Sequence, residues 1–131
     1  MTRQVFNLIM MICISIGFLT GCQKQDQKPA ARVVESYLQA LVAEDSNRIS
    51  NLVCKDWEEQ AQTELDAFIG VKASLKDMTC DQTGNDGPHI LVQCKGTILA
   101  TYNNENQELT LEGRTYRVIQ DNGDWYVCGY K

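Results

Sequence analysis

The first 22 residues of this chain decide most about what the remainder can fold into. A basic residue, Arg3, precedes a mostly apolar run over residues 5–19, and the small residues Thr20 and Gly21 stand directly before Cys22. A basic start, a short apolar segment and small residues at a cleavage point are typical of a secretory signal peptide. The alternative is an uncut membrane anchor, but polar residues interrupt the run, which is shorter than the roughly 20 residues that span a bilayer. We therefore predict that this segment is a signal peptide that is removed from the mature chain.

The segment Leu19-Thr20-Gly21-Cys22 resembles the lipobox of bacterial lipoproteins. In that family the cysteine sulfur receives a diacylglycerol, and the peptide is cut just before it. The resemblance implies that residues 1–21 are a lipoprotein signal peptide and that lipid on Cys22 holds the protein to a membrane of the cell envelope, on the extracytoplasmic side. The Asp that signals inner-membrane retention in enterobacterial lipoproteins is replaced by Gln23, so the outer membrane is expected if the host has two.

Length and charge limit the mature chain to one domain without a nucleic-acid partner. It has 131 − 21 = 110 residues, which suits a single modest core. Loss of Arg3 leaves 12 − 1 = 11 Lys and Arg residues against 17 Asp and Glu residues, a net charge of −6. Binding to nucleic acid would require a basic stripe, and the mature sequence contains no block of like charge.

Four cysteines matter for the fold, because Cys13 leaves with the signal and Cys22 carries lipid. The remaining ones are Cys54, Cys80, Cys94 and Cys128. Outside the cytoplasmic membrane an even number of cysteines predicts disulfides. The alternative is a zinc site, which usually contains close pairs such as C-x-x-C, and these are absent. We predict disulfides and no metal or other cofactor, although four cysteines allow three connectivities.

Strand positions favour the pairing Cys80–Cys94 with Cys54–Cys128. Cys80 ends one predicted strand and Cys94 lies on the next, where opposite residues have Cβ atoms about 4.5–5.5 Å apart. The predicted phase of the last strand turns Cys128 away from Cys54, so this second bond requires a bulge. Two glycines are candidate positions for it: Gly123 and Gly129. Without a bulge, the alternative is Cys54–Cys80 with Cys94–Cys128.

A polar tether over residues 22–29 leads into predicted helices. The first helix has an apolar stripe at helical spacing, made by Val34, Tyr37, Leu38, Leu41 and Val42. Ser46 is the expected cap of a second helix, and Asp56 with Glu59 forms the pattern of a capping box for a third. The third helix has its own buried face, made by Trp57, Ala61, Leu65, Phe68 and Ile69. Gly70 is its expected stop.

After Gly70 the periodicity becomes strand-like. We predict a strand over residues 71–80, a turn region over residues 81–88, and a strand over residues 90–102 in which Gly96 marks a bulge or a close backbone approach. A third strand joins Leu109 and Leu111 to Tyr116 and Val118 through a bulge at Gly113-Arg114. Asn122-Gly123 fits a type I′ turn to a fourth strand. That turn sets three pairs opposite each other: Gln120 and Trp125, Val118 and Val127, Tyr116 and Gly129.

Helices followed by antiparallel strands predict an α+β domain, with N-terminal helices packed on one face of a curved four-stranded antiparallel sheet. Two segments carry a resemblance to the nuclear transport factor 2-like superfamily, also called cystatin-like or SnoaL-like: residues 34–41, Val-Glu-Ser-Tyr-Leu-Gln-Ala-Leu, and residues 121–127, Asp-Asn-Gly-Asp-Trp-Tyr-Val. The ending over residues 125–130, Trp-Tyr-Val-Cys-Gly-Tyr, is similar to small secreted bacterial lipoproteins of that type. The resemblance spans most of residues 30–130 and implies one such domain over residues 30–131.

The same resemblance implies a cone whose open end can hold a small apolar molecule. Four aromatic residues could line it: Tyr37, Trp57, Tyr102 and Tyr116. For Trp57, a place in the core is the more common role of a tryptophan on an apolar helical stripe. Enzymes with this fold need a positioned base and a donor for a developing oxyanion.

No catalytic residue is predicted. The one histidine, His89, is expected in a solvated turn, and the capping role of Asp56 explains it without chemistry. Arg114 and Arg117 could clamp an anion, but two such arginines more often bracket surface carboxylates such as Glu112. Motifs of known catalytic sites, including H-E-x-x-H, G-x-S-x-G and the P-loop, are absent.

The sequence therefore favours a membrane-anchored, non-enzymatic binding module whose partner is an envelope protein or a small apolar ligand. The alternative is an isomerase-like or dehydratase-like enzyme that uses the cone. A deep apolar pocket with an unpaired carboxylate would favour the enzyme, whereas a cone filled by its own Trp and Tyr side chains would favour the binding module.

Overall fold

The computed structural model describes residues 28–131. The predicted signal peptide, the lipid attachment at Cys22 and most of the predicted tether lie outside these described residues. Within residues 28–131, none of the helices combines the length and apolar character needed to cross a membrane.

The first helix, α1 (Pro29–Val42), is the central element of the helical layer. Proline at its first position costs no hydrogen bond, because the N–H there has no partner inside a helix. Its predicted apolar stripe is buried except at Val42, which is partly buried, and Tyr37 and Leu38 are 0% exposed.

The second helix, α2 (Ser46–Leu52), is capped by Asp45. The Asp45 carboxylate accepts a 3.0 Å hydrogen bond from the backbone N–H of Arg48, three positions on. The predicted cap at Ser46 is therefore wrong by one residue, since a capping side chain must lie outside the helix to reach that N–H.

A short 3-10 helix, η1 (Lys55–Trp57), leads into α3 (Glu58–Asp66). The predicted capping box is wrong, because Asp56 lies inside η1 with an exposed side chain and α3 has no side-chain cap. Just before η1 the chain is held to the sheet, where the N–H of Cys54 donates to the carbonyl of Val127 at 2.9 Å. The helix can begin only after this contact. The helix α3 ends at Asp66, four residues before the predicted stop, and Gly70, with φ +75°, ends the turns that follow it.

Five antiparallel strands form one sheet, which corrects the predicted count of four. They are β1 (Lys72–Asp86), β2 (His89–Tyr102), β3 (Glu105–Thr110), β4 (Thr115–Asp121) and β5 (Asp124–Tyr130). A turn splits the expected third strand: Gly113 has φ +93°, and the N–H of Glu112 donates to Oγ1 of Thr110 at 3.1 Å. The two pieces pair with different halves of β2, β4 with residues 90–93 and β3 with residues 97–102.

The β1–β2 hairpin is longer than predicted. β1 continues through Asp86 and turns at Gly87-Pro88, so the predicted turn region over residues 81–88 is wrong. Residues 81–86 are polar, but they stay extended because they pair with the first residues of β2.

The close backbone approach predicted at Gly96 is confirmed. Gly96 has φ +109°, and a Cβ at this position would lie 2.7 Å from the carbonyl oxygens of Lys76 and Asp77. The β1–β2 register shifts at the same place, between Lys76 and Thr79. Only glycine fits such an approach at positive φ.

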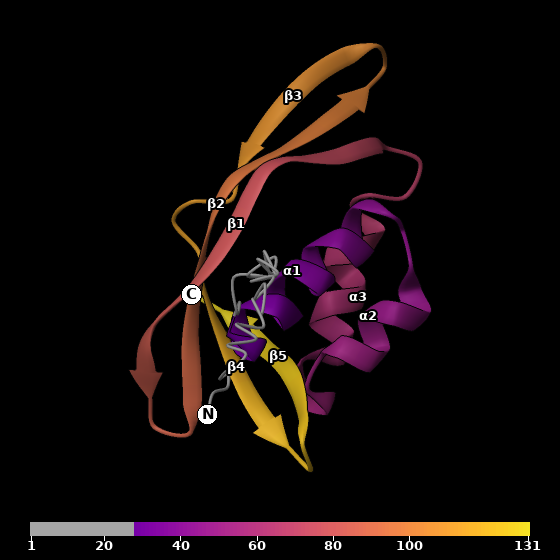
Figure 1. The fold of residues 1–131 in the computed structure, drawn as a ribbon. Coiled ribbons are helices and arrows are strands. Elements are labelled where there is room, and N and C mark those ends of the chain that lie inside the picture. The colour runs from indigo at the N-terminus through magenta and orange to yellow at the C-terminus, as the bar shows by residue number, and fades with distance from the viewer. Residues whose placement is uncertain (1–27) are drawn as a thin grey trace, which may run out of the picture.

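The helices cover one face of the curved sheet, as predicted (Figure 1). The core between the two layers is continuous and draws on every helix and on the central strands. Its fully buried members include Val34, Tyr37, Leu38, Ile49, Val92, Tyr116, Val118 and Val127.

The β4–β5 hairpin turns at Asn122-Gly123, and both residues have positive φ as a type I′ turn requires. Two predicted pairs are confirmed: Gln120 with Trp125, and Val118 with Val127. Tyr116, however, pairs with Tyr130 instead of Gly129, because β5 has one more residue than β4 between this pair and the last.

This bulge contains Cys128 and Gly129. A regular strand was predicted to turn the side chain of Cys128 away from Cys54, and the bulge makes the bond between them possible. Cys128 is bonded to Cys54, with their Cα atoms 4.9 Å apart. Cys80 is bonded to Cys94, its opposite residue on β2, at a Cα–Cα distance of 4.1 Å. The pairing favoured by strand positions is therefore the one in the structure.

Candidate functional site

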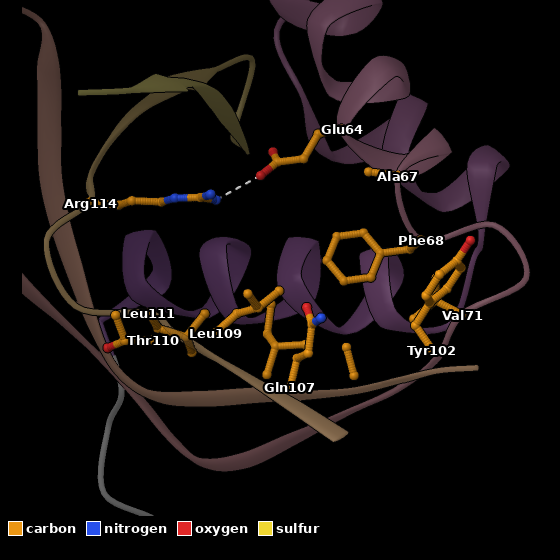
Figure 2. A pocket seen from close by; sticks show the side chains of 12 residues that line it. Glu64, Ala67, Phe68, Val71, Tyr102, Gln107, Leu109, Thr110, Leu111 and Arg114 are labelled. Carbon is orange, nitrogen blue, oxygen red and sulfur yellow. Dashed lines mark hydrogen bonds and ion pairs between the residues drawn. The ribbon is translucent and has the colours of Figure 1, made fainter. Parts of the chain in front are cut away.

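A pocket of about 400 Å³ lies between α3 and the β2–β3 hairpin (Figure 2). This volume falls in the range of small-molecule sites. Most of the lining is apolar, from Ala67, Phe68, Val71, Ile98, Ala100, Tyr102, Leu109 and Leu111. Four polar residues complete it: Glu64, Gln107, Thr110 and Arg114. Tyr102 and Leu109 are 60% and 45% exposed, so apolar surface continues outward from the pocket.

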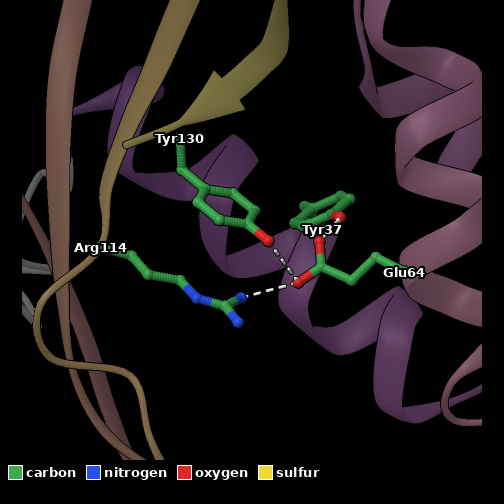
Figure 3. Close-up of polar contacts among 4 residues, drawn as sticks. All are labelled: Tyr37, Glu64, Arg114 and Tyr130. Carbon is green, nitrogen blue, oxygen red and sulfur yellow. Dashed lines mark hydrogen bonds and ion pairs between the residues drawn. The ribbon is translucent and has the colours of Figure 1, made fainter.

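Glu64 accepts hydrogen bonds from side chains of three other segments (Figure 3). One carboxylate oxygen, Oε2, accepts from the hydroxyl of Tyr37 at 2.5 Å. The other, Oε1, lies 2.7 Å from Nη1 of Arg114 and 3.4 Å from the hydroxyl of Tyr130. The side chain of Glu64 is only 13% exposed, against 42% for Arg114. Both oxygens of this largely buried carboxylate are therefore occupied by donors.

Local structure explains how these side chains meet. Glu64 lies on α3 three residues after Ala61 and four before Phe68, which places it on the buried face of the helical segment. Arg114 follows the turn at Gly113, which redirects the chain between β3 and β4. Tyr130 follows the bulge in β5, and its ring covers one face of the guanidinium, with Cζ of Arg114 4.5 Å from the ring centroid.

The environment keeps the tyrosines of this cluster neutral. Burial, with the charge of Glu64 and the hydrogen bond to it, raises the pKa of Tyr37 far above its ordinary value. Burial also raises the pKa of Tyr116 to about 12, against the opposing effect of Arg114. For Arg114, partial burial alone would lower the pKa, but Glu64 and Tyr116 together raise it. The tyrosine hydroxyls therefore stay protonated and Arg114 stays charged at neutral pH.

An aromatic cluster fills the interior beside the ion pair. The Tyr37 ring lies 5.4 Å from that of Trp57 and 6.4 Å from that of Tyr116, and Tyr130 is 5.9 Å from Trp57 and 5.5 Å from Tyr116, centroid to centroid. Of the four residues considered for a pocket, Tyr102 lines this one, whereas Tyr37, Trp57 and Tyr116 belong to the aromatic cluster. The hydroxyl of Tyr116 is buried and has no hydrogen-bond partner among the described residues.

The remaining candidates lie apart from the pocket. Arg117 points to the sheet face opposite Tyr116, where its Nη2 donates to Nδ1 of His89 at 3.1 Å. His89 is thus the first residue of β2 and half-buried, instead of a solvated turn residue. The structure brings Arg114 to Glu64 and not to Glu112, so the two arginines form no joint clamp. Asp56 is exposed and outside the pocket lining.

Sequence reasoning missed Glu64. The available signal was its spacing, because positions 57, 61, 64 and 68 form one stripe along the third helix, and Glu64 is the one charged residue on it. A carboxylate on an apolar stripe requires a partner in the fold.

This arrangement suits binding better than proton transfer. Glu64 already accepts three hydrogen bonds, one of them from the guanidinium of Arg114, so taking a proton from a substrate would cost this carboxylate its ion pair. Across residues 28–131 there is no group of three or more His, Cys, Asp or Glu side chains that could hold a metal ion.

Comparisons with known proteins show likeness of fold only. No protein-family model matches this sequence, and the comparison with curated proteins gives no match. The structure is similar to the intermembrane space region of the chloroplast protein ARC6, with a TM-score of 0.54 and 16% identity over 82% of this chain and 96% of that one.

Two likenesses are weaker. A SEC-C motif containing protein from Rhodopseudomonas palustris has a TM-score of 0.49 and 10% identity, over 76% of this chain and 74% of that one. A designed nuclear transport factor 2-like protein has a TM-score of 0.47 and 12% identity, over 76% and 92%. Neither of these two likenesses carries a statement about family or function.

Proposed function

We propose that this protein is a lipid-anchored binding module of the bacterial cell envelope, whose pocket takes a small and mainly apolar molecule. One observation carries the proposal: the pocket of about 400 Å³ has apolar walls, and its one carboxylate, Glu64, is occupied by donors on both oxygens. Apolar walls with a few placed polar groups are the usual composition of a small-molecule site.

Two features support a place outside the cytoplasm. The lipobox-like segment Leu19-Thr20-Gly21-Cys22 predicts export and lipid attachment. The structure contains two disulfides, Cys54–Cys128 and Cys80–Cys94, and such bonds persist mainly in oxidising compartments.

The alternative, an isomerase-like or dehydratase-like enzyme, receives less support. It requires a carboxylate or imidazole that is free to act as a base toward the pocket. Glu64 is engaged with Tyr37 and Arg114, while Asp56 and His89 lie outside the pocket lining. The aromatic cluster fills the interior beside the ion pair, which is the arrangement expected of a binding module.

Lipid attachment is tested by replacing the proposed acceptor. Cys22→Ala should abolish labelling of the protein by a radioactive fatty acid and leave the precursor uncut, because the thioether forms only at this sulfur. Cys13→Ala, a matched control within the apolar run, should be labelled and processed like the wild type. Persistent labelling of Cys22→Ala would refute the lipoprotein assignment.

Occupation of the pocket is tested with two matched alanines. Ala67 and Ala43 both follow the last residue of a helix and are exposed, but only Ala67 lines the pocket. The lipidated protein and each variant would be extracted with surrounding membrane into polymer-bounded discs and purified, and the bound small molecules identified by mass spectrometry. Disc lipids are common to all samples and cancel in the comparison.

We expect a molecule that co-purifies with the wild type and with Ala43→Trp and that is lost from Ala67→Trp, because the indole occupies the pocket. Circular dichroism of both variants would confirm that the fold is retained. The same molecule at the same amount in Ala67→Trp would rule out this pocket as its site.

A further inference from the structure

We infer that the ligand of this pocket is an elongated apolar molecule that ends in a hydrogen-bond acceptor, a carbonyl or carboxylate oxygen, held by Arg114. This inference rests on the proposed function, since it names the ligand class for the same pocket.

The first step is the state of Glu64. A carboxylate accepts hydrogen bonds and donates none, and here one oxygen accepts from Tyr37 while the other accepts from Arg114 and Tyr130. With 13% of its side chain exposed, it has little room for another donor. Three of its roughly four lone-pair positions are used, so a ligand that offers an ammonium group would find at most one acceptor position here.

The second step is the surplus of donors on Arg114. A guanidinium carries five N–H groups, and among the described residues only Glu64 is seen to accept from Arg114, through Nη1 at 2.7 Å. Tyr130 covers one flat face of the group but not its N–H edges. Arg114 is 42% exposed and lines the pocket, so its remaining edge is accessible to an acceptor oxygen.

The third step is the arrangement of polar and apolar side chains around the pocket. Figure 2 shows the Glu64–Arg114 pair on one side of the pocket, with Phe68, Val71 and Tyr102 grouped on the other side. A ligand that satisfies both ends has an acceptor at one end and an apolar body that reaches the rings. The same orientation disfavours a cationic end group, because that group would face the guanidinium of Arg114 and be repelled by it.

The experiment compares three unbranched probes of ten carbons each: decanoate, decan-2-one and decylammonium. Binding to the lipidated protein in liposomes would be measured at probe concentrations below micelle formation, with protein-free liposomes subtracted. We expect decanoate and decan-2-one to bind at least about tenfold more tightly than decylammonium, since only they accept hydrogen bonds from Arg114.

Two variants separate the charge of the pair from its donors. Glu64→Gln removes the negative charge that partly neutralises Arg114, so the affinity for decanoate should rise about tenfold while that for decan-2-one changes less than about twofold. Arg114→Gln should remove the preference for acceptors. Arg117→Gln is the matched control, because this arginine lies on the opposite sheet face and should leave all three affinities unchanged.

Equal binding of decylammonium and decanoate to the wild type would overturn the inference, as would an acceptor preference that survives in Arg114→Gln. Binding of no probe would overturn it as well. The proposed function fails separately: if Ala67→Trp binds all three probes like the wild type, the pocket itself is not the site.

Discussion

Glu64 shows how one charged side chain can be accommodated on a buried helix face. Burial of an isolated carboxylate would cost several kcal/mol, so the fold must provide partners. It does so from three separate segments, through Tyr37 on α1, Arg114 before β4 and Tyr130 on β5. The hydroxyl of Tyr116 lies in the same cluster, but it has no hydrogen-bond partner among residues 28–131.

Two matched substitutions test this difference between the tyrosines. Tyr37 and Tyr116 are both 0% exposed, and Phe at either position preserves the ring packing. Tyr37→Phe should lower the free energy of unfolding by about 1.5–3 kcal/mol, because a hydrogen bond to a charged group is lost. Tyr116→Phe should change it by less than about 0.5 kcal/mol or increase it, since a buried hydroxyl without a partner is removed. Urea unfolding measures both, and equal losses would show that the Tyr116 hydroxyl is satisfied.

At the scale of elements, Gly96 divides the long strand β2 into two parts that belong to different regions of the sheet. Gly96 lies at the close approach to β1, and on either side of it β2 pairs with a different strand. Ile98 and Ala100 follow Gly96 on β2, and both line the pocket. The pocket therefore depends on a glycine that lies outside its lining.

Gly96→Ala tests this dependence. Its Cβ would clash with the carbonyls of Lys76 and Asp77, and φ +109° is strained for alanine, so we expect a loss of about 2–4 kcal/mol in the free energy of unfolding. Gly84→Ala is the control within β1, because a Cβ there meets nothing within 4 Å and its φ is ordinary for alanine. Thermal and urea unfolding give the comparison. A loss no larger than that of Gly84→Ala would mean that the hairpin adjusts without cost.

For the whole molecule, the two disulfides act at different ranges. Cys80–Cys94 closes a separation of 14 residues inside one hairpin, whereas Cys54–Cys128 spans 74 residues and joins the helical layer to the last strand. In the chain-entropy model a disulfide stabilises by restricting the unfolded chain, and the effect grows slowly with loop length.

Removal of each disulfide should show that the one closing the longer loop stabilises the fold more. The pair Cys80→Ala and Cys94→Ala should cost about 3 kcal/mol, and the pair Cys54→Ala and Cys128→Ala about 4 kcal/mol, because the second closes the longer loop. Urea unfolding of the two double variants beside the wild type measures both losses. If the short-loop variant proves the less stable one, packing around Cys80 and Cys94 outweighs chain entropy.

The sequence by itself determined the features that depend on neighbours along the chain. Helical spacing of apolar residues located α1 and most of the buried face of the third helix, and Asn122-Gly123 located the last hairpin, because both follow from backbone geometry within a few residues. Ile69, which was predicted on that buried face, is 62% exposed because it lies beyond the end of α3.

The positions of Cys80 and Cys94 on neighbouring predicted strands favoured the observed disulfides, with Cys54 and Cys128 left to each other. The predicted register of the last hairpin opposed this second bond, so a bulge near Gly123 or Gly129 had to be assumed.

Tertiary structure alone decided the strand count, the extent of β1 and the site. Residues 81–86 carry no apolar signal and are extended only because β2 lies beside them. Glu64, Arg114 and Tyr130 are far apart in sequence, and their meeting depends on the packing of α3 against the sheet and on the bulge in β5. Local patterns specify which face of an element is buried, but which side chains meet across that face depends on how the layers pack, and single-element periodicity holds no information about it.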